Sequence, residues 1–294
     1  MTMRVLGTAG HVDHGKSTLV RALTGIDPDR LAEEKRREMT IDLGFAWFSD
    51  SSGETIGIVD VPGHRDFIEN MLAGVGGIDA VLFIIAADEG IMPQTREHLA
   101  IINLLAIPNG IIVMTKCDMV NDDDWLDLIE TEIRDTVQNT VLADAPIIRI
   151  SAHTGMGMDT LKSAISALLA TLPPRIGGKF PRLPIDRVFT LSGFGTVVTG
   201  TLLDGSLKIG DEVELQPSGV KGKIRGLHSY NQAVGVAQSG TRTAVNVSGI
   251  EKNAIRRGDT LTLPNRLSPT QRIDAYFRHL PDVDRPLKHN AQIK

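Results

Sequence analysis

The sequence predicts an α/β domain with a mostly parallel sheet and helices on both faces, followed by an antiparallel β-barrel and the start of a second β-barrel. Continuous apolar runs alternate with helical patterns as far as Leu172, which is typical of a parallel sheet covered on both faces. From Arg182 the pattern changes to short alternating strands between turns. Another strand pattern, cut short by the end of the chain, begins at Ile273. The expected domains are therefore residues 1–173, 174–266 and 267–294.

Composition narrows the classes of protein that fit. Of the 294 residues, 41% are hydrophobic and 23% are charged, which is ordinary for a globular protein. The formal net charge of −5 gives no basic footprint for nucleic acid, so RNA would have to bind through local patches. The single cysteine, Cys117, excludes an internal disulfide framework and a cysteine-based zinc site. We see no leader and no apolar run approaching 18 residues, and we expect a cytoplasmic protein that does not enter the membrane.

Residues 10–17 read G-x-x-x-x-G-K-S, the pattern of a phosphate-binding loop. An apolar strand at residues 5–9 precedes the loop, and residues 18–23 follow it at helical spacing. Backbone N–H groups and the positive end of the helix would then converge on a polyphosphate. Lys16 would lie between the β- and γ-phosphates, with the Ser17 hydroxyl on Mg²⁺. The residues expected at the phosphates are His11, Val12, Asp13, His14, Gly15, Lys16, Ser17 and Thr18.

A second informative stretch ends in Asp60-Val61-Pro62-Gly63. An apolar strand at residues 55–59 delivers the Asp60 carboxylate at its end, and Pro-Gly then forces a turn. Asp60 would lie near the metal ion, and the Gly63 N–H would face the γ-phosphate. A capped turn would use the same residues, so this stretch alone leaves both interpretations open.

The densely charged residues 27–38 favour a helix, with Asp27 as its cap and Pro28 in its first position. Such a run of charges is usually a solvated helix face. The alternative is a segment that senses the phosphates.

The pattern Thr115-Lys116-Cys117-Asp118 follows the apolar residues 110–114. A carboxylate at Asp118 can accept both the N1–H and the exocyclic NH₂ of guanine, whereas adenine has no matching pair of donors. The aliphatic stem of Lys116 can cover the base, and a backbone N–H after the strand at residues 146–150 can reach the guanine carbonyl. Motifs in this order predict a P-loop GTPase domain. The expected guanine contacts are Thr115, Lys116, Asp118, Ser151, Ala152 and His153.

The other expected elements have weaker signals. Helical patterns cover residues 70–75, 95–105 and 160–172. Strand patterns for the barrel cover residues 188–191, 196–202, 211–215, 221–227, 241–247 and 260–263, and the last strand pattern begins at residues 273–277.

Together these motifs, with Gly195-Thr196-Val197-Val198-Thr199-Gly200 in the barrel, resemble the translational GTPases of the elongation factor Tu type. Four further stretches are similar to the selenocysteine-specific elongation factors, the SelB group. The resemblance to this group covers nearly the whole chain. These stretches are residues 29–35, 39–45, 72–79 and 184–189.

The resemblance implies roles for the residues around the phosphates. Ser17 and Thr40 are implied as Mg²⁺ ligands, and Asp60 as a ligand through water. His64 is implied as the residue that positions the attacking water on the ribosome. The implied catalytic residues are His64, Lys16 and Asp13, and Asp13 would lie near a monovalent cation. Thr40 and Gly63 are implied at the γ-phosphate. Val12 and Met39 are implied as an apolar gate in front of His64.

The resemblance also implies that the barrel holds the aminoacyl end of a tRNA. A selenol is more acidic than a thiol, so a small cationic pocket would select ionised selenocysteine over serine. Arg187, Arg225 and His228 are the expected cations, with Asp186 on the amino group. Solvated barrel residues would look the same in the sequence.

The implied function is a GTP-hydrolysing switch that binds selenocysteinyl-tRNA and delivers it to the ribosome. GTP, GDP and Mg²⁺ are the implied ligands, and a selenocysteine-insertion mRNA hairpin would be bound by C-terminal domains beyond this chain. A monomer is expected. The alternatives are the GTPase subunit of a sulfate adenylyltransferase, another factor of the Tu type, or a module that binds GTP and GDP but barely turns over.

Two positions depart from the wider superfamily. Thr115 stands where Asn is usual, which keeps a hydroxyl but loses an amide from the contact that braces the loop. Glu38 stands where Gly usually precedes the switch threonine, and its bulk and negative charge predict weaker ordering of that loop.

Overall fold

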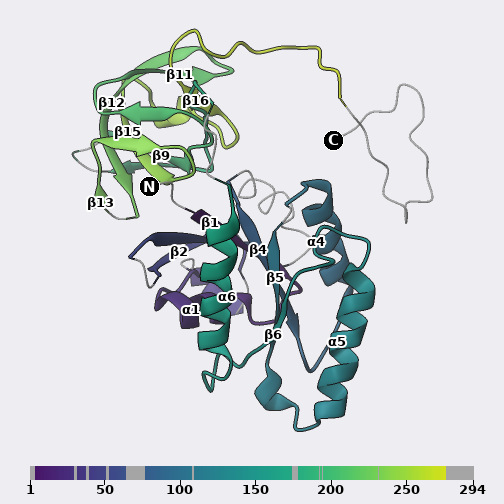
Figure 1. Ribbon diagram of the computed structural model, residues 1–294. Coiled ribbons are helices and arrows are strands. Elements are labelled where there is room, and N and C mark those ends of the chain that lie inside the picture. Colours follow the sequence, from purple (N-terminus) through teal and green to yellow (C-terminus); the bar gives the residue numbers. More distant parts are fainter. Residues whose placement is uncertain are drawn as a thin grey trace.

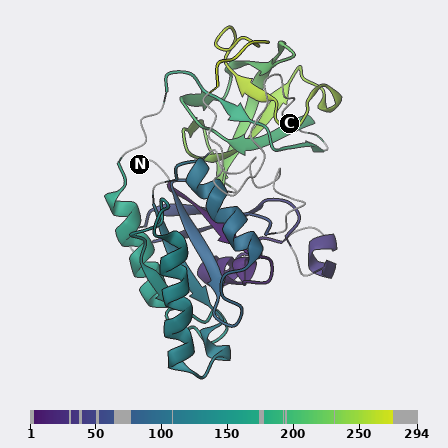
Figure 2. The ribbon, with the colours of Figure 1, turned by 90° about the vertical axis from the view of Figure 1, so that its right-hand side faces the viewer.

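The chain folds into an α/β layer structure and a β-barrel that lies at one end of it, as both views in Figures 1 and 2 show. The computed structural model describes residues 4–29, 32–37, 40–50, 53–63, 77–107, 109–173, 178–191, 193, 195–230 and 232–275.

The first part is a six-stranded sheet in the order β2-β3-β1-β4-β5-β6. Every neighbouring pair is parallel except β2 and β3, which are antiparallel. Each parallel strand therefore ends at the same edge of the sheet, and the loops that leave this edge can meet. The strands are β1 Arg4–Gly10, β2 Gly44–Ser49, β3 Thr55–Asp60, β4 Ala80–Ala86, β5 Gly110–Thr115 and β6 Ile147–Arg149.

The central strand β4 is apolar throughout because both of its faces are covered. Val81, Phe83 and Ile85 point into the cluster packed by two helices, and Leu82 and Ile84 point into the opposite cluster. The helices on the first face are α4 Pro93–Leu104 and α5 Asp123–Val137, and those on the second face are α1 Lys16–Thr24 and α6 Met158–Thr171.

Local chemistry sets where these helices begin and end. Gly15 and Gly25 flank α1 in the left-handed region, with φ of 80° and 73°, a conformation that costs glycine nothing. Pro93 occupies the first turn of α4, where a missing N–H loses no hydrogen bond. The Asp122 side chain accepts from the N–H groups of Asp124 and Trp125 and so caps α5.

The second part is an eight-stranded antiparallel sheet in the order β7-β16-β11-β12-β15-β9-β8, with β13 on β12 and a separate pair β10-β14. Alternating residues of its strands fill one apolar core, for example Val213, Leu215, Val245 and Val247. The strands are β7 Leu183–Pro184, β8 Arg187–Leu191, β9 Gly195–Thr201, β10 Ser206–Lys208, β11 Glu212–Gln216, β12 Val220–Ser229, β13 Gln232–Ala233, β14 Val236–Gln238, β15 Arg242–Ser248 and β16 Thr260–Thr262.

The predicted helix over residues 27–38 is wrong at its start. Helix α2 spans only Ala32–Arg37. Pro28 is not helical, because it packs against Gly44, where an added Cβ would lie 2.7 Å from the Pro28 Cβ. Asp27 caps a turn instead, since its carboxylate accepts from the Asp29 N–H at 3.1 Å.

The strand expected at residues 273–277 is absent from its described part, residues 273–275. Ile273 is 78% exposed, and no strand of the described residues pairs with it. The helix expected at residues 70–75 lies outside the described residues. No helix within the described ranges is long and apolar enough to span a bilayer.

Candidate functional site

The phosphate-binding loop joins the end of β1 to the start of α1 and lines a cavity of about 550 Å³. Gly10 has a φ of 145°, and a Cβ there would lie 2.2 Å from the Ile84 carbonyl oxygen, so the loop leaves β1 where only glycine fits. Helix α1 then starts at the cavity, and its unpaired N–H groups favour an anion. The lining residues are Val12, Asp13, Gly15, Lys16, Ser17, Thr18, Arg21, Asp27, Asp29, Glu34, Thr40 and Gly63.

Lys16 is the buried cation of this cavity, with 6% of its surface exposed. Its ammonium donates to the His11 carbonyl oxygen at 2.6 Å. Burial lowers its pKa to about 8, while the carboxylates of Asp60, Asp13 and Asp29 act in the opposite direction. Because burial disfavours this charge, an anionic ligand at the ammonium would stabilise it further.

A chain of hydroxyls and carboxylates runs from the lining of the cavity to the residues behind it. The Ser17 hydroxyl lies 2.8 Å from the Thr40 hydroxyl and donates to Asp60 Oδ2 at 2.8 Å. Thr40 donates to Asp29 Oδ1 at 2.8 Å, and Thr8 donates to Asp60 Oδ1 at 2.6 Å. Burial raises the pKa of Asp60 to about 6, against the hydrogen bonds from Thr8 and Ser17 and the charge of Lys16.

These oxygens fit Mg²⁺. Adjacent ligands of an octahedral Mg²⁺ lie about 3 Å apart when its bonds are about 2.1 Å long, close to the Ser17–Thr40 separation of 2.8 Å. No three His, Cys, Asp or Glu side chains among the described residues gather as a metal centre. The Ser17 and Thr40 hydroxyls are the oxygens here that could ligate the ion directly. Asp60 does not line the cavity and lies one hydrogen bond behind Ser17.

Gly63 closes one side of this cavity. A Cβ at Gly63 would lie 2.4 Å from the Lys16 ammonium and 2.8 Å from the Val12 nitrogen. The close approach places the Gly63 backbone against the phosphate-binding loop. His64 and Met39 lie outside the described residues.

Helix α4 holds this loop from behind, which the sequence motifs did not reveal. His98 Nδ1 accepts from the Gly10 N–H at 3.0 Å, and Gln94 accepts from the Val12 N–H at 3.2 Å. His98 also forms a hydrogen bond with the Gly63 backbone, and burial lowers its pKa to about 3. A neutral imidazole therefore ties the phosphate-binding loop to the Gly63 turn. The available signal was the position of His98 on the buried face of the predicted helix.

The loops expected to bind guanine meet beside the phosphate-binding loop. Thr115 donates to the His14 carbonyl oxygen at 2.7 Å, so the threonine hydroxyl retains a bracing contact at this position. Lys116 has a φ of 56°, and its ammonium pairs with Asp88 at 3.1 Å and with Glu89 at 3.6 Å. Asp118 is exposed, in the 3₁₀ turn η2 Cys117–Met119, and does not line the phosphate cavity.

The loop after β6 lies against this turn, since the Cys117 N–H donates to the Ile150 carbonyl oxygen at 3.2 Å. The Ser151 N–H is already donated to the Met156 carbonyl oxygen at 2.9 Å. The Ala152 N–H forms no hydrogen bond within the described ranges and remains available for a base. His153 is exposed.

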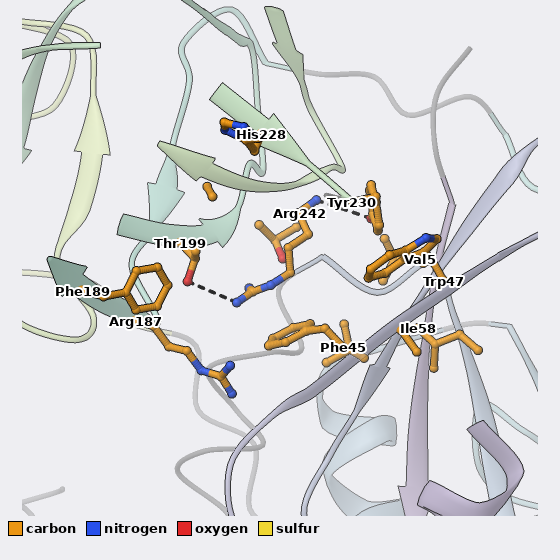
Figure 3. A pocket seen from close by; sticks show the side chains of 15 residues that line it. Val5, Phe45, Trp47, Ile58, Arg187, Phe189, Thr199, His228, Tyr230 and Arg242 are labelled. Atoms are coloured by element: carbon orange, nitrogen blue, oxygen red, sulfur yellow. Dashed lines mark hydrogen bonds between the residues drawn. The ribbon is translucent and has the colours of Figure 1, made fainter. Parts of the chain in front are cut away.

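A second cavity, of about 260 Å³, lies between the sheet and the barrel and is shown in Figure 3. The Arg242 guanidinium lies over the Phe45 ring, 3.3 Å from its centroid. The same guanidinium forms a two-pronged pair with Asp186, which also accepts from the Thr199 hydroxyl at 2.8 Å. We call this cavity the arginine pocket. It is lined by Val5, Phe45, Ala46, Trp47, Gly57, Ile58, Val59, Arg187, Phe189, Thr199, Thr201, His228, Tyr230, Arg242 and Ala244.

The arginine pocket brings together only part of the predicted aminoacyl site. Arg187 and His228 line it, and Asp186 lies behind it on Arg242. Arg225 is exposed where β12 shifts its register, and it is not among the lining residues. His228 lies apart from the stacked Arg242 and Phe45 in Figure 3. Arg242 was missed, because only the antiparallel pairing of β15 with β9 brings it beside Thr199 and Asp186.

Two glycines let the sheet and the barrel approach closely. A Cβ at Gly57 would lie 2.7 Å from the Tyr230 hydroxyl, and one at Gly77 would lie 2.3 Å from Thr201 Cγ2. Trp47 packs edge-on against Tyr230, with ring centroids 5.8 Å apart.

Comparison with known families agrees with both parts of the structure. Residues 1–171 match the model of the elongation factor Tu GTP binding domain, and residues 195–262 match that of elongation factor Tu domain 2. The fold is therefore of the elongation factor Tu type.

Individual relatives are more specific. The chain is 49% identical, over 98% of its length, to a selenocysteine-specific elongation factor of Desulfomicrobium baculatum, and it covers 45% of that protein. Its structure is similar to the crystal structure of a bacterial selenocysteine-specific elongation factor, EF-Sec, with a TM-score of 0.85, 37% identity and coverage of 90% of this chain and 45% of that one. Elongation factor SelB of Methanococcus maripaludis, in complex with the GTP analogue GppNHp, gives a TM-score of 0.79, 34% identity and coverage of 90% and 56%. The chain thus spans about half the length of these relatives.

Proposed function

The chain belongs to the family of the elongation factor Tu GTP-binding domain, and from this membership we propose that it hydrolyses GTP and, in its GTP-bound form, holds selenocysteinyl-tRNA for the ribosome. The observation that carries the proposal is the pairing of two cavities in one molecule. One has a buried lysine beside a hydroxyl and carboxylate chain, and the other has two arginines. The names of the relatives support selenocysteine as the amino acid, in preference to the sulfate adenylyltransferase alternative.

In this proposal the triphosphate occupies the 550 Å³ cavity. Lys16 contacts the β- and γ-phosphates, and the N–H groups from His11 to Thr18 surround them. Ser17 and Thr40 would hold Mg²⁺ directly, and Asp60 would hold one of its waters. A bound Mg²⁺ neutralises charge on the transferred phosphoryl group. Asp13, with a φ of 64°, lines the cavity where a monovalent cation could assist.

Hydrolysis is then a matter of placing a water and stabilising charge. We assign the γ-phosphate contact to the Gly63 N–H and the placement of water to His64, held back by Val12 and Met39 until the ribosome is bound. His64→Ala should leave GTP binding intact and abolish hydrolysis stimulated by the ribosome. Stimulation that survives the substitution would remove His64 from the mechanism.

We assign base selection to Asp118, with the Lys116 stem over the base and the Ala152 N–H at the guanine carbonyl; Thr115, Ser151 and His153 shape the loops around it. Asp118→Asn should shift preference from guanine to xanthine nucleotides, because an amide presents a donor where the carboxylate only accepts. Unchanged GTP affinity in this variant would contradict the base site.

For the amino acid we propose the arginine pocket. Arg187 and Arg242 would attract the ionised selenol, and Asp186 would orient Arg242 and lie near the amino group. His228, which lines this pocket, and Arg225, on the barrel surface outside it, remain candidates. A pocket this small suits one amino-acid side chain.

The whole protein would act as a monomer in the cytoplasm, with its domains divided at about residues 173 and 266. We infer that the selenocysteine-insertion hairpin of the mRNA is bound outside the present 294 residues, because the formal net charge of −5 leaves no general footprint for RNA.

The test is protection of the ester bond of aminoacyl-tRNA. With a non-hydrolysable GTP analogue, the chain should slow deacylation of selenocysteinyl-tRNA and not that of seryl-tRNA, and GDP should remove the protection. Equal protection of both tRNAs would contradict selenocysteine specificity, and protection of neither would contradict tRNA binding by this chain.

A further inference from the structure

Residues 40–45 run directly from the phosphate cavity to the arginine pocket. At one end the Thr40 hydroxyl contacts Ser17 at 2.8 Å. At the other end the Phe45 ring lies under Arg242. Between them, the Ile41 and Asp42 N–H groups donate to the buried carboxylate of Glu34, at 3.1 and 3.0 Å, so the backbone here is held in place. We call residues 40–45 the linking segment.

Asp42 is the residue of this segment that forms ion pairs with the barrel. Its Oδ2 accepts from Arg187 Nε at 3.0 Å and lies 2.9 Å from Arg187 Nη2, and its Oδ1 lies 3.4 Å from Arg257 Nη2. Arg187 Nη2 also donates to the Leu43 carbonyl oxygen at 2.6 Å. The linking segment therefore holds one edge of the Arg187 guanidinium with both a side chain and the backbone.

These contacts determine which N–H groups of Arg187 remain for a ligand. Its Nε and Nη2 are engaged, and Nη1 forms no hydrogen bond with any described residue. The guanidinium lies 5.4 Å from the Phe45 ring centroid, beside the Arg242 that covers the same ring. Without Asp42, only the Leu43 carbonyl would hold this long side chain, and the ligand itself would have to order the rest of it.

We propose that Asp42 is the positioning residue for Arg187, and that through it the position of Thr40 controls whether the arginine pocket can hold its ligand. This inference rests on the proposed function, because it needs a nucleotide at Thr40 and an anionic group in the pocket. Only two residues, Ile41 and Asp42, lie between Thr40 and Leu43, so a shift of Thr40 at the phosphates displaces Asp42 and the Leu43 carbonyl together.

The coupling works in both directions. Segments that contact the γ-phosphate and its Mg²⁺ are ordered by them and released on hydrolysis. A ligand that favours the ordered form must, in return, favour the nucleotide that orders it. An occupant of the arginine pocket therefore strengthens GTP binding by the same factor by which GTP strengthens its own.

Trp47 reports on this pocket, which it lines. The only other tryptophan, Trp125, is on the surface of α5, so Trp125→Phe leaves Trp47 as the sole reporter. In this background, Trp47 emission should differ between the complexes with GDP and with a non-hydrolysable GTP analogue. Asp42→Ala should remove most of that difference while both nucleotides still bind, because Asp42 does not line the phosphate cavity.

Ester protection gives the second measurement. The ratio of selenocysteinyl-tRNA affinities in the GTP-analogue and GDP forms should fall about tenfold in Asp42→Ala, within the range typical of coupled sites. Asp42→Glu should recover part of the ratio. Arg257→Gln is the matched control, since Arg257 contacts the same carboxylate without lining the arginine pocket, and it should leave the ratio within about twofold.

The outcomes separate the claims. A Trp47 signal that ignores the nucleotide, or a ratio unchanged by Asp42→Ala, overturns the role of Asp42 and leaves GTP binding standing. A merely structural role would lower both affinities together and leave their ratio unchanged, which also overturns it. Failure of the parent chain to bind nucleotide overturns the proposed function along with this inference.

Discussion

The phosphate cavity and the arginine pocket handle charge in opposite ways. In the phosphate cavity the one hydrogen bond that the buried Lys16 ammonium makes with the described residues goes to a neutral carbonyl oxygen. In the arginine pocket Arg242 is paired with Asp186, and Arg187 is paired with Asp42. In the phosphate cavity the ligand would supply the negative charge that neutralises the buried cation. In the arginine pocket, carboxylates of the protein itself neutralise the two cations.

This difference suits two kinds of ligand. A polyphosphate carries several charges and can repay the desolvation of an ammonium and of helix N–H groups. A single amino-acid side chain carries at most one charge, so a pocket of unpaired arginines would cost more to bury than such a ligand returns. Prior pairing with Asp186 and Asp42 offsets the cost of burying the two guanidiniums, and it leaves Arg187 Nη1 without a partner among the described residues.

The largest effect that we expect is on nucleotide binding. Lys16→Ala should weaken GTP binding about 100-fold or more, since losing a charge-assisted hydrogen bond to phosphate costs about 3 kcal/mol. Titration with a fluorescent GTP analogue measures this. Arg21→Ala is the control, because Arg21 lines the same cavity but is exposed, and its loss should cost less than about fivefold. Similar losses in both variants would show that general positive potential, and not the buried ammonium, binds the phosphates.

The next effect tests the neutralised pocket. Asp186→Asn and Arg242→Met should each destabilise the protein by about 3 kcal/mol, because each leaves a buried charge without its partner. The double variant should lose less than the sum of the two. Urea unfolding measures all three, and Arg225→Met, at an exposed position, should stay within about 0.5 kcal/mol. Additive losses would mean that the two charges do not compensate each other.

Lowering the pH should reduce the free energy of unfolding, through two buried histidines near the phosphate cavity. Burial lowers the pKa of His14 to about 4 and that of His98 to about 3, against 6.5 for an ordinary histidine, and the nearby charge of Lys16 lowers both further. The unfolded chain then binds more protons below pH 6.5, so the free energy of unfolding should fall as the pH is lowered from there, by about 3 kcal/mol for each histidine at pH 4.

Urea unfolding at a series of pH values measures this slope. His98→Gln should make the slope shallower, and His228→Gln, at an exposed position, should not change it. A slope unaffected by His98→Gln would mean that His98 is not held neutral.

The smallest effect concerns the contact between the base loop and the phosphate loop. Thr115→Ala removes the hydrogen bond to the His14 carbonyl oxygen and should cost about 1 kcal/mol of unfolding free energy. Thr131→Ala removes a similar bond, from the Thr131 hydroxyl to the Asp127 carbonyl oxygen, on the exposed face of α5 and should cost almost nothing. Thr115→Asn should recover most of the loss, and equal behaviour of Thr115→Ala and Thr131→Ala would show that the bracing contact is not specific.

The same contrast explains what the sequence could predict. The phosphate-binding loop is contiguous, and parallel strands bring their ends to one edge, so Lys16, Ser17 and Asp60 could be placed from their order along the chain. The partners of Asp186 and Arg187 could not, because Asp42 and Arg242 reach them only through the docking of two domains and the register of β15.

Two errors have a related cause. The charge pattern predicts a helix through Asp29, but its carboxylate reaches Thr40 through a contact that no local pattern encodes. The segment that begins at Ile273 has the composition of a strand, but Ile273 has no partner strand among the described residues. The periodicity of the sequence describes one segment by itself, whereas hydrogen bonds and strand pairing depend on the other segments that lie beside it in the fold.

The glycines where the sheet meets the barrel limit how freely such domains can be exchanged. Tyr230 and Thr201 of the barrel each occupy the space that a side chain at Gly57 or Gly77 would need. A barrel transplanted from another factor would therefore fit this sheet only if it carried residues of the same bulk at those two positions. Chimeras should be assembled from matched pairs of surfaces, with the two glycines and the two barrel residues inherited as one unit.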